Sequence, residues 1–207
     1  MPQLVPLPSL EVHEVWDAAF MAALQDRPPD EMQRRFDDGH RAYVAWWNDE
    51  PVAWGWVATR IASIGEIGAT FEIPPGERYL WNFVTLPSHR GLGIYPRLLQ
   101  AIVRAEGAEA TRFWIGYAPE NHASGAGIAK AGFTMSAEVS FDASGRAAAR
   151  ALAPDGGAAV SRVLGIRETT EDLTPCWRCV RAGRGAMSCA EGSCACDYQV
   201  SGSGCAL

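Results

Sequence analysis

Cysteine is absent from the first 175 residues of this 207-residue chain, and the whole chain contains a single lysine, Lys130. Residues 1–175 therefore have neither a disulfide framework nor a thiolate metal site. No apolar run is long enough to cross a bilayer. Residues 1–8 are rich in proline and lack a basic group, unlike a signal peptide. These absences predict a cytoplasmic protein with no membrane partner.

An excess of positive charge is also lacking, because 18 lysines and arginines stand against 24 aspartates and glutamates. The formal net charge is −6 and the pI is about 5.2, so the chain lacks the basic excess that a broad nucleic-acid surface needs. Hydrophobic residues make up 48% of the chain, which is enough for one substantial core. We expect a soluble protein that does not bind nucleic acid.

A glycine turn between a strand and a helix is the most informative feature that is present. Residues 79–85 are rich in aromatic and β-branched residues and predict a strand, and apolar residues at helical spacing follow from Leu98. Between them lie Arg90, Gly91 and Gly93. Glycines allow close backbone approach, and the first N–H groups of a helix have no internal partner. This turn therefore predicts a site for phosphate oxygens.

Two familiar phosphate loops do not fit this turn. A Walker loop requires a lysine after its last glycine, and Lys130 lies elsewhere in the chain. A dinucleotide fingerprint requires a third glycine where this sequence has Pro96. Proline is compatible with the first turn of a helix, so Pro96 agrees with a helix that begins near residue 94.

The sequence Arg90-Gly-Leu-Gly93-Ile-Tyr95 resembles the pyrophosphate loop of the GNAT superfamily of acyl-CoA-dependent N-acyltransferases, [QR]-x-x-G-x-[GA], with a departure at Tyr95. A second block resembles the family's N-x-x-[SA]…K-x-G-F region. It runs from Asn121-His-Ala-Ser124 to Lys130-Ala-Gly132-Phe133. The two blocks stand in the family's order and spacing, and the resemblance covers about residues 42–141.

The resemblance implies an α/β fold with a mixed, largely antiparallel sheet, a splayed central strand pair and flanking helices. We assign residues 1–170 to this domain and residues 171–207 to a cysteine-rich tail. Sequence patterns predict helices over 11–24 and 30–38, a hairpin of 41–47 with 52–61, and a strand over 112–117. They also predict a strand that the Gly132-Phe133 pair opens and that ends near 141, and a last strand over 158–166.

The resemblance also implies a bound acetyl-CoA. The backbone of the central strand would pair with the pantetheine arm, and the loop amides would hold the pyrophosphate. Two residues downstream match positions that contact the pantetheine or its phosphate. The implied cofactor residues are Phe83, Val84, Thr85, Arg90, Gly91, Leu92, Gly93, Ile94, Tyr95, Asn121 and Ser124.

The catalytic groups are less clear, because Ile128 stands where many family members have a tyrosine acid. Tyr117 and Tyr95 are the alternative acids. Asn82 occupies the strand position that often holds a base or a water, and an amide there orients rather than accepts a proton. The candidate bases are His122, Glu72, Glu77 and Glu120.

Four tryptophans, Trp46, Trp47, Trp54 and Trp56, lie on the predicted hairpin. Hydrophobic packing explains them by default, and an aromatic acceptor pocket is the alternative.

All six cysteines lie in the tail, in the pattern C-x2-C-x9-C-x4-C-x-C-x8-C. In a reducing compartment this favours metal over disulfides, and we expect a zinc site on Cys176, Cys179, Cys194 and Cys196. A redox dithiol, an iron–sulfur site and a flexible extension remain open alternatives.

These observations together predict an N-acetyltransferase that moves an acetyl group from acetyl-CoA to a primary amine by direct attack on the thioester. A small-molecule amine is favoured as acceptor over a protein amine, because the acidic composition does not suggest a groove for a basic peptide. The alternative is a catalytically weakened CoA-binding or regulatory module that acts through its tail.

Overall fold

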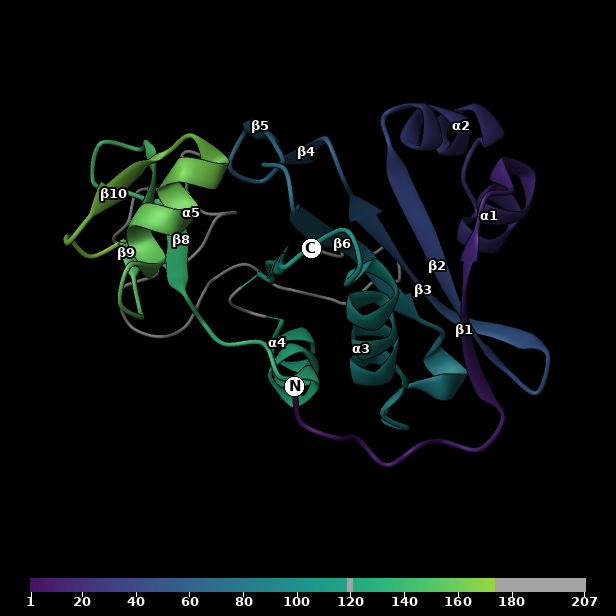
Figure 1. The fold of residues 1–207 in the computed structure, drawn as a ribbon. Coiled ribbons are helices and arrows are strands. Elements are labelled where there is room, and N and C mark those ends of the chain that lie inside the picture. The colour runs from purple at the N-terminus through teal and green to yellow at the C-terminus, as the bar shows by residue number, and fades with distance from the viewer. Residues whose placement is uncertain (119–120, 174–207) are drawn as a thin grey trace.

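The computed structural model describes residues 1–118 and 121–173. Its main sheet has five strands in the order β1-β2-β3-β6-β7, and all neighbours are antiparallel except the parallel pair β6 and β7 (Figure 1). The predicted mixed, largely antiparallel sheet is therefore confirmed. The strands are β1 (Leu10–Val15), β2 (His40–Trp47), β3 (Glu50–Ala58), β6 (Glu77–Thr85) and β7 (Arg112–Ile115).

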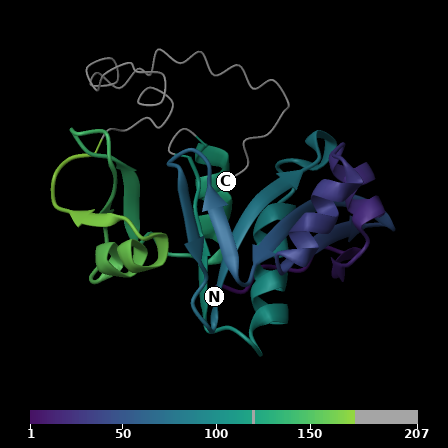
Figure 2. The ribbon, with the colours of Figure 1, turned by 90° about the horizontal axis from the view of Figure 1, so that it is seen from above.

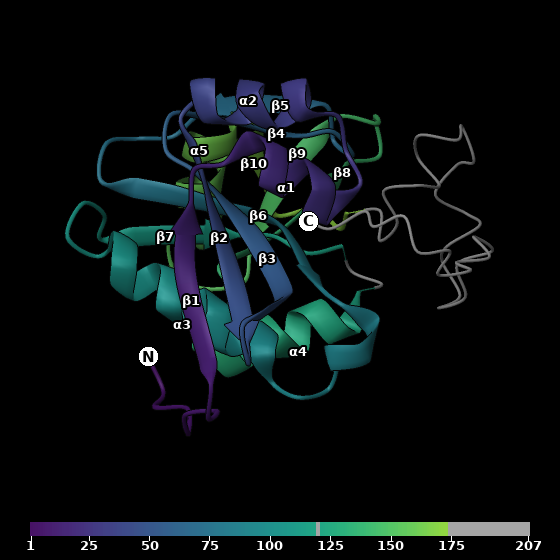
Figure 3. The same ribbon diagram turned by 90° about the vertical axis from the view of Figure 1, so that its right-hand side faces the viewer.

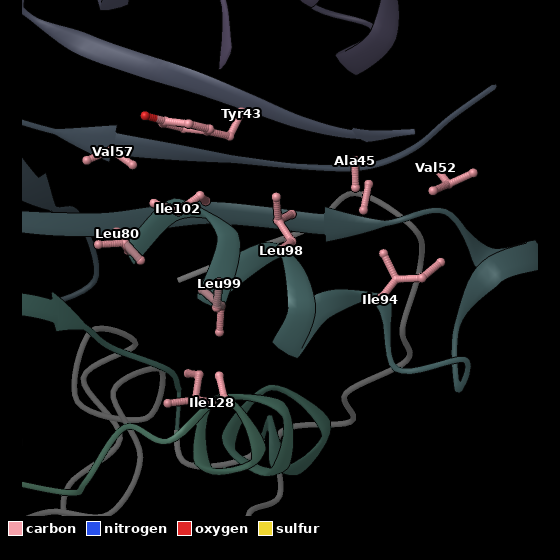
Figure 4. Close-up of a cluster of buried hydrophobic side chains, with 12 residues drawn as sticks. Tyr43, Ala45, Val52, Val57, Leu80, Ile94, Leu98, Leu99, Ile102 and Ile128 are labelled. Carbon is pink, nitrogen blue, oxygen red and sulfur yellow. The ribbon is translucent and has the colours of Figure 1, made fainter. Parts of the chain in front are cut away.

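Helices cover both faces of this sheet (Figure 3). Alternate side chains of β2 point to opposite faces of the sheet. Val44 packs with α1 and α2, whereas Tyr43 packs with α3 and α4. Figure 4 shows the second of these cores, in which Leu98 and Leu99 of α3 lie between the sheet and Ile128 of α4. The helices are α1 (Ala18–Gln25), α2 (Pro29–Asp37), α3 (Ile94–Glu106) and α4 (His122–Ala131).

The C-terminal part of the described chain forms a second, three-stranded sheet in the order β10-β9-β8. Figure 2 shows this sheet and its helix to one side of the main sheet. Their apolar side chains share a core with the β4–β5 hairpin and with Tyr79 of β6. The elements are β4 (Ile61–Ile64), β5 (Ala69–Glu72), β8 (Ala137–Phe141), β9 (Ala147–Ala151), α5 (Gly156–Leu164) and β10 (Arg167–Thr169).

A buried ionic cluster fixes the C-terminal end of α3 to the main sheet. The Glu106 side chain is fully buried and accepts hydrogen bonds from Arg78 at 2.6 Å, Arg41 at 3.1 Å and the Tyr43 hydroxyl at 2.7 Å. Removing one partner from such a buried cluster leaves an uncompensated charge. The cluster therefore sets the position of α3, whose other end carries the glycine loop.

Two elements predicted from the sequence are wrong. Residues 11–24 form β1 and α1 rather than one helix, because residues 10–15 pair with β2 and the Asp17 carboxylate caps α1 by accepting from Phe20 N at 2.9 Å. Residues 158–166 lie mostly in α5, where Val160, Val163 and Leu164 take helical spacing toward the core.

The strand after Gly132-Phe133 also differs from the prediction. It begins at Ala137 rather than at the glycine–phenylalanine pair, because the chain first crosses to the second sheet. There it pairs with β9, a strand that the alanine-rich sequence did not reveal. The predicted 30–38 helix, the hairpin and the strands at 79–85 and 112–117 are confirmed as α2, β2 with β3, β6 and β7. The second hairpin strand ends at residue 58 rather than 61, where β4 begins, and β7 ends at residue 115 rather than 117.

Candidate functional site

The strands β6 and β7 separate halfway along β6. They pair only from Glu77 with Arg112 to Leu80 with Ile115, whereas β6 continues to Thr85. Among the described strands, none pairs with that edge of β6 beyond Leu80. The backbone of residues 81–85 is thus open to a ligand on this side, which confirms the expected splayed pair.

A β-bulge in β6 accompanies this separation. Trp54 pairs with Val84 and Trp56 with Trp81, so Gly55 alone faces both Asn82 and Phe83. Asn82 takes a positive φ of 51°, a conformation that asparagine tolerates better than most residues. A Cβ on Gly55 would overlap the Phe83 ring. Glycine at position 55 is therefore what allows Phe83 to lie across β3.

The glycine loop follows β6 after the short 3-10 helix Pro87–His89. Gly91 and Gly93 have positive φ values of 78° and 73°, and Gly93 is the N-cap of α3 without a side-chain cap hydrogen bond. Leu92 is exposed and Ile94, the first residue of α3, is buried. No cap side chain therefore accepts hydrogen bonds from the first N–H groups of this 13-residue helix, and these groups are available to a ligand.

Basic side chains surround this loop. Arg97 donates to Gly93 O at 2.7 Å, and Arg90 donates to Thr85 O at 3.2 Å. The Lys130 ammonium of α4 lies 3.9 Å from the position of a Cβ on Gly93. Within the described part of the chain, none of these three cations forms an ion pair. Arg97 also donates to Val5 O at 2.9 Å, so its guanidinium bridges two backbone carbonyls, whereas the charges of Arg90 and Lys130 are available to an anion at the loop.

Lys130 was part of the second sequence block, but no role was predicted for it. Its position beside the loop depends on the packing of α4 against α3, which brings residues 93 and 130 together. The one feature of the sequence that could have indicated a role for Lys130 is that it is the single lysine of the chain.

The departure at Tyr95 is accommodated by α4. The Tyr95 ring lies over Gly127, where a Cβ would overlap it, and its hydroxyl lies 3.4 Å from Ser124 Oγ. Its centroid is 5.5 Å from that of Phe83. Burial raises the pKa of Tyr95 to about 12. The ring is thus directed between the two helices and does not cover the loop amides.

Asn121, Ser124 and Tyr117 lie around the start of α4. Asn121 is its N-cap, and its side-chain oxygen accepts from Ser124 N at 3.1 Å. The Tyr117 ring follows β7 and packs over Gly125, where a Cβ would lie 2.7 Å from it. The Tyr117 hydroxyl makes a weak contact of 3.7 Å with Met135 Sδ. The rings of Tyr117 and Tyr95 therefore each pack against a glycine of α4, Gly125 and Gly127 respectively.

The other catalytic candidates differ in their surroundings. Asn82 is half-buried in the bulge, and His122 is exposed at the first position of α4. Ile128, which replaces the family tyrosine, is buried in the core. Among the remaining candidate bases, Glu72 is exposed, Glu77 is bound by Arg162 at 2.9 Å, and Glu120 lies outside the described residues.

The Trp81 side chain, next to the bulge, is held by two basic residues. Its Nε1 donates to His40 Nδ1 at 3.0 Å, and the Arg35 guanidinium lies 4.7 Å from its ring centroid. Burial lowers the pKa of His40 to about 4. Neutral His40 therefore serves as the acceptor that orients Trp81.

The tryptophans of the β2–β3 hairpin mainly pack in the core. Trp54 and Trp56 are 6% and 0% exposed, while Trp46 stacks on Phe20 with centroids 5.5 Å apart. Trp47 lies 6.0 Å from the His89 ring. Hydrophobic packing therefore explains Trp54 and Trp56.

The cysteines of the tail, with the expected zinc ligands Cys176, Cys179, Cys194 and Cys196, lie outside the described residues. Within residues 1–118 and 121–173, no three potential metal ligands cluster. The helices in these same ranges are each too short or too polar to cross a membrane.

The solved structures that match this chain include aminoglycoside acetyltransferases. AAC(6')-Ih from Acinetobacter baumannii is 16% identical with a TM-score of 0.47, over 64% of this chain and 96% of that chain. A soil-metagenome enzyme solved with sisomicin is 9% identical with a TM-score of 0.49, over 65% and 94%. AAC(6')-Iy, solved with CoA, is 16% identical with a TM-score of 0.48, over 64% and 97%.

Comparison with curated protein sequences finds no match. The model of the acetyltransferase (GNAT) family matches residues 9–133, which span the sheet from β1 to β7 together with the glycine loop and α4. This match supports an acetyltransferase, and nothing in it supports the alternative of a regulatory CoA-binding module. The chain belongs to the GNAT family of acetyltransferases, which use acetyl-CoA to acetylate amines.

Proposed function

We propose that this protein acetylates the primary amine of a small molecule, in a site formed where β6 and β7 separate. The observation that carries the proposal is the open backbone edge of residues 81–85 directly beside an uncapped helix N-terminus with the basic side chains of Arg90 and Lys130. An extended pantetheine arm with a pyrophosphate at one end has the matching chemistry, because its amides pair with a strand edge and its phosphates with N–H groups.

Acetyl-CoA is placed by groups from both helices. The pyrophosphate would lie on the amides of residues 90–95, within reach of Arg90 and Lys130. The pantetheine would follow Phe83, Val84 and Thr85 along the open edge of β6. Asn121 and Ser124 at the start of α4 would contact its other side. These positions direct the thioester toward the bulge at Asn82.

The reaction forms one bond and breaks one. The lone pair of the neutral amine nitrogen attacks the thioester carbonyl carbon, and backbone N–H groups on the open β6 edge stabilise the oxyanion that develops. The C–S bond then breaks and the sulfur leaves as a thiolate, which takes up a proton. The amine nitrogen loses its extra proton to a base or to water, so the products are an amide and CoA with a free thiol.

Tyr117 is the acid that this arrangement favours. It follows β7 directly where the two strands part, its ring is seated on Gly125, and its hydroxyl has only a weak sulfur contact. Tyr95 is buried between α3 and α4 and bonded to Ser124, so it is less free to donate. Asn82 would orient the amine or a water, and His122 at the start of α4 would accept the released proton.

A small-molecule amine fits the electrostatics of the chain. Amines are largely protonated in neutral solution, and a net charge of −6 favours the approach of a cation. The neutral fraction of the amine then reacts within the site.

The substitution Gly93→Asp tests this function. A carboxylate about 4 Å from a pyrophosphate charge costs several kcal/mol at a partly exposed site, so we expect the KM for acetyl-CoA to rise by about a hundredfold or more. Thiol release measured with a panel of small amines gives this value. Gly68→Asp is the matched control, because Gly68 has a similar φ of 66° and open space around it in the β4–β5 hairpin. An unchanged KM in Gly93→Asp would contradict the loop assignment.

A further inference from the structure

A cavity of about 930 Å³ runs along the outer edge of β7, between the main sheet and the second sheet. β7 is the last strand of its sheet, so this edge is not covered by another strand among the described residues. On the opposite side the cavity is bounded by β8 and by Ala159 and Val160 of α5. A volume of this size accommodates a small organic molecule.

The cavity reaches the place where β6 and β7 separate. Gly116 and Tyr117, the residues that follow β7, contribute to its wall, and Gly125 and Ile128 of α4 do the same. Tyr117 is also the proposed acid. This end of the cavity therefore lies beside the place where the two strands separate, and the rest of the cavity follows β7.

The wall is mainly apolar, with a single buried polar group that lacks a partner. Tyr79 is 4% exposed, and its hydroxyl makes no hydrogen bond within the described residues. This hydroxyl lies 3.8 Å from the position of a Cβ on Gly116, at the end of β7. Burying an unpaired hydroxyl is unfavourable, so such a group is expected to have a function.

Charged side chains in the wall are few. They are Arg112, Glu138 and Asp155, and the Glu138 carboxylate is already bound by Arg150 at 2.6 Å. A ligand with several ammonium groups would need several free carboxylates in its site. The lining therefore suits an amine on an apolar body rather than a polycationic sugar.

We propose that this cavity holds the acceptor, and that the acceptor is a primary amine on an aromatic or similarly apolar body with one polar atom that hydrogen-bonds to the Tyr79 hydroxyl. This inference rests on the proposed function, because it places the acceptor at the end of the same site. The apolar body fills the space along β7, and the amine lies beside Tyr117 where the acetyl group arrives.

The test compares two amines that differ by one hydroxyl, tyramine and 2-phenylethylamine, on the full chain with saturating acetyl-CoA. Thiol release gives the KM for each amine. In Tyr79→Phe we expect the KM for tyramine to rise about fivefold, the effect of one lost hydrogen bond, with the KM for 2-phenylethylamine nearly unchanged. Because the variant removes an unpartnered buried hydroxyl, we also expect the unliganded protein to melt at the same or a higher temperature.

A cavity-filling pair of variants tests the location independently. Ala159→Phe places a ring in the cavity and should raise the KM for both amines at least about tenfold. Ala158→Phe is the matched control, because Ala158 is exposed on the same helix and does not line the cavity. It should leave both KM values unchanged.

The proposal is overturned if Tyr79→Phe affects the two amines equally, or if Ala159→Phe leaves both KM values as they were. A lower KM for sisomicin, the aminoglycoside bound in one of the similar structures, than for either amine would also overturn it. Amine turnover that is indifferent to Ala159→Phe would refute the cavity assignment and leave the proposed function intact. A lack of acetyl-CoA binding, measured before any amine is added, would refute both.

Discussion

At the residue scale, Lys130 is the side chain that would complete the proposed anion site. It is the single lysine of the chain, and its ammonium approaches the glycine loop from α4 rather than from the loop itself. The N–H groups of the helix supply directional donors, whereas an ammonium supplies a mobile full charge. Together they balance the charge of a pyrophosphate better than either does alone.

Removing this charge should weaken cofactor binding selectively. We expect Lys130→Gln to raise the Kd for acetyl-CoA about fivefold to tenfold, with a shallower dependence on salt, because one screened charge interaction is lost. Calorimetry at two salt concentrations measures both effects. The matched control is Arg104→Gln, which removes an exposed cation from the last turn of α3, far from the loop. Equal effects of the two substitutions would mean that Lys130 acts only through net charge.

The geometry of individual residues could be predicted where it depends on their neighbours in the sequence. Arg90, Gly91 and Gly93 are neighbours in the chain, so their turn geometry could be inferred and the structure gives both glycines a positive φ. Lys130 and Tyr79 gain their surroundings from packing between distant elements. The pattern of the sequence contains no direct signal for such contacts. The roles of Asn82, Tyr117 and His122 stay predictions.

At the scale of elements, two glycines of α4 determine how this helix meets its neighbours. Gly127 receives the Tyr95 ring of α3, and Gly125 receives the Tyr117 ring that follows β7. Glycine in a helix interior is destabilising by about 1 kcal/mol relative to alanine, and here it leaves the space that the two rings occupy. The position of α4 in turn sets the distance between Lys130 and the loop.

Because of this packing, we expect the effect of Gly127→Ala on the free energy of unfolding to change sign when Tyr95 is also replaced. Gly127→Ala alone should lower the free energy of unfolding by about 1–3 kcal/mol, because its Cβ overlaps the Tyr95 ring. In a Tyr95→Ala background the same substitution should raise it by roughly 0.5–1 kcal/mol through helix propensity. Urea unfolding of the four proteins in this cycle measures the coupling. If Gly127→Ala has the same sign in both backgrounds, Tyr95 does not occupy the space over Gly127.

Element boundaries were the least predictable part of the fold. Val12 and Val15 fit a helical stripe with the residues that follow, yet pairing with β2 makes residues 10–15 a strand. Residues 158–166 carry apolar side chains that suit either period, and packing against the second sheet selects a helix. In both segments the tertiary partner outweighs a weak local preference.

At the scale of the whole molecule, the two faces of the main sheet pack against different pairs of helices. One face packs α3 and α4, which carry residues of the proposed cofactor site, and the other packs α1 and α2 around a cluster of tryptophans. Trp81 joins this cluster to the bulge, and neutral His40 orients it. Protonation of His40 would therefore disturb the core beside the site.

This arrangement predicts a loss of stability in acid. The pKa of His40 is lowered to about 4, below the value of about 6.5 expected in the unfolded chain. The unfolded state thus binds the proton more readily, and the stabilisation that is complete above pH 6.5 is lost as the pH falls toward 4. The loss amounts to roughly 3 kcal/mol.

Urea unfolding at pH 7 and pH 4 measures this loss, with His40→Asn as the comparison. Asparagine retains an acceptor for Trp81 Nε1 but does not titrate, so the variant should lose less stability than the wild type over this range. The same pH dependence in both proteins would show that His40 is not the group responsible.

In the proposed function, the open edge of β6 and the glycine loop form one binding site for acetyl-CoA. Calorimetric titration of the full chain with acetyl-CoA is the experiment that decides whether this site exists. The structure predicts one site per chain with a Kd in the micromolar range, which corresponds to about −8 kcal/mol. An absence of measurable binding would contradict the claim and would show that Tyr95, despite its place over Gly127, is incompatible with a pyrophosphate at the loop.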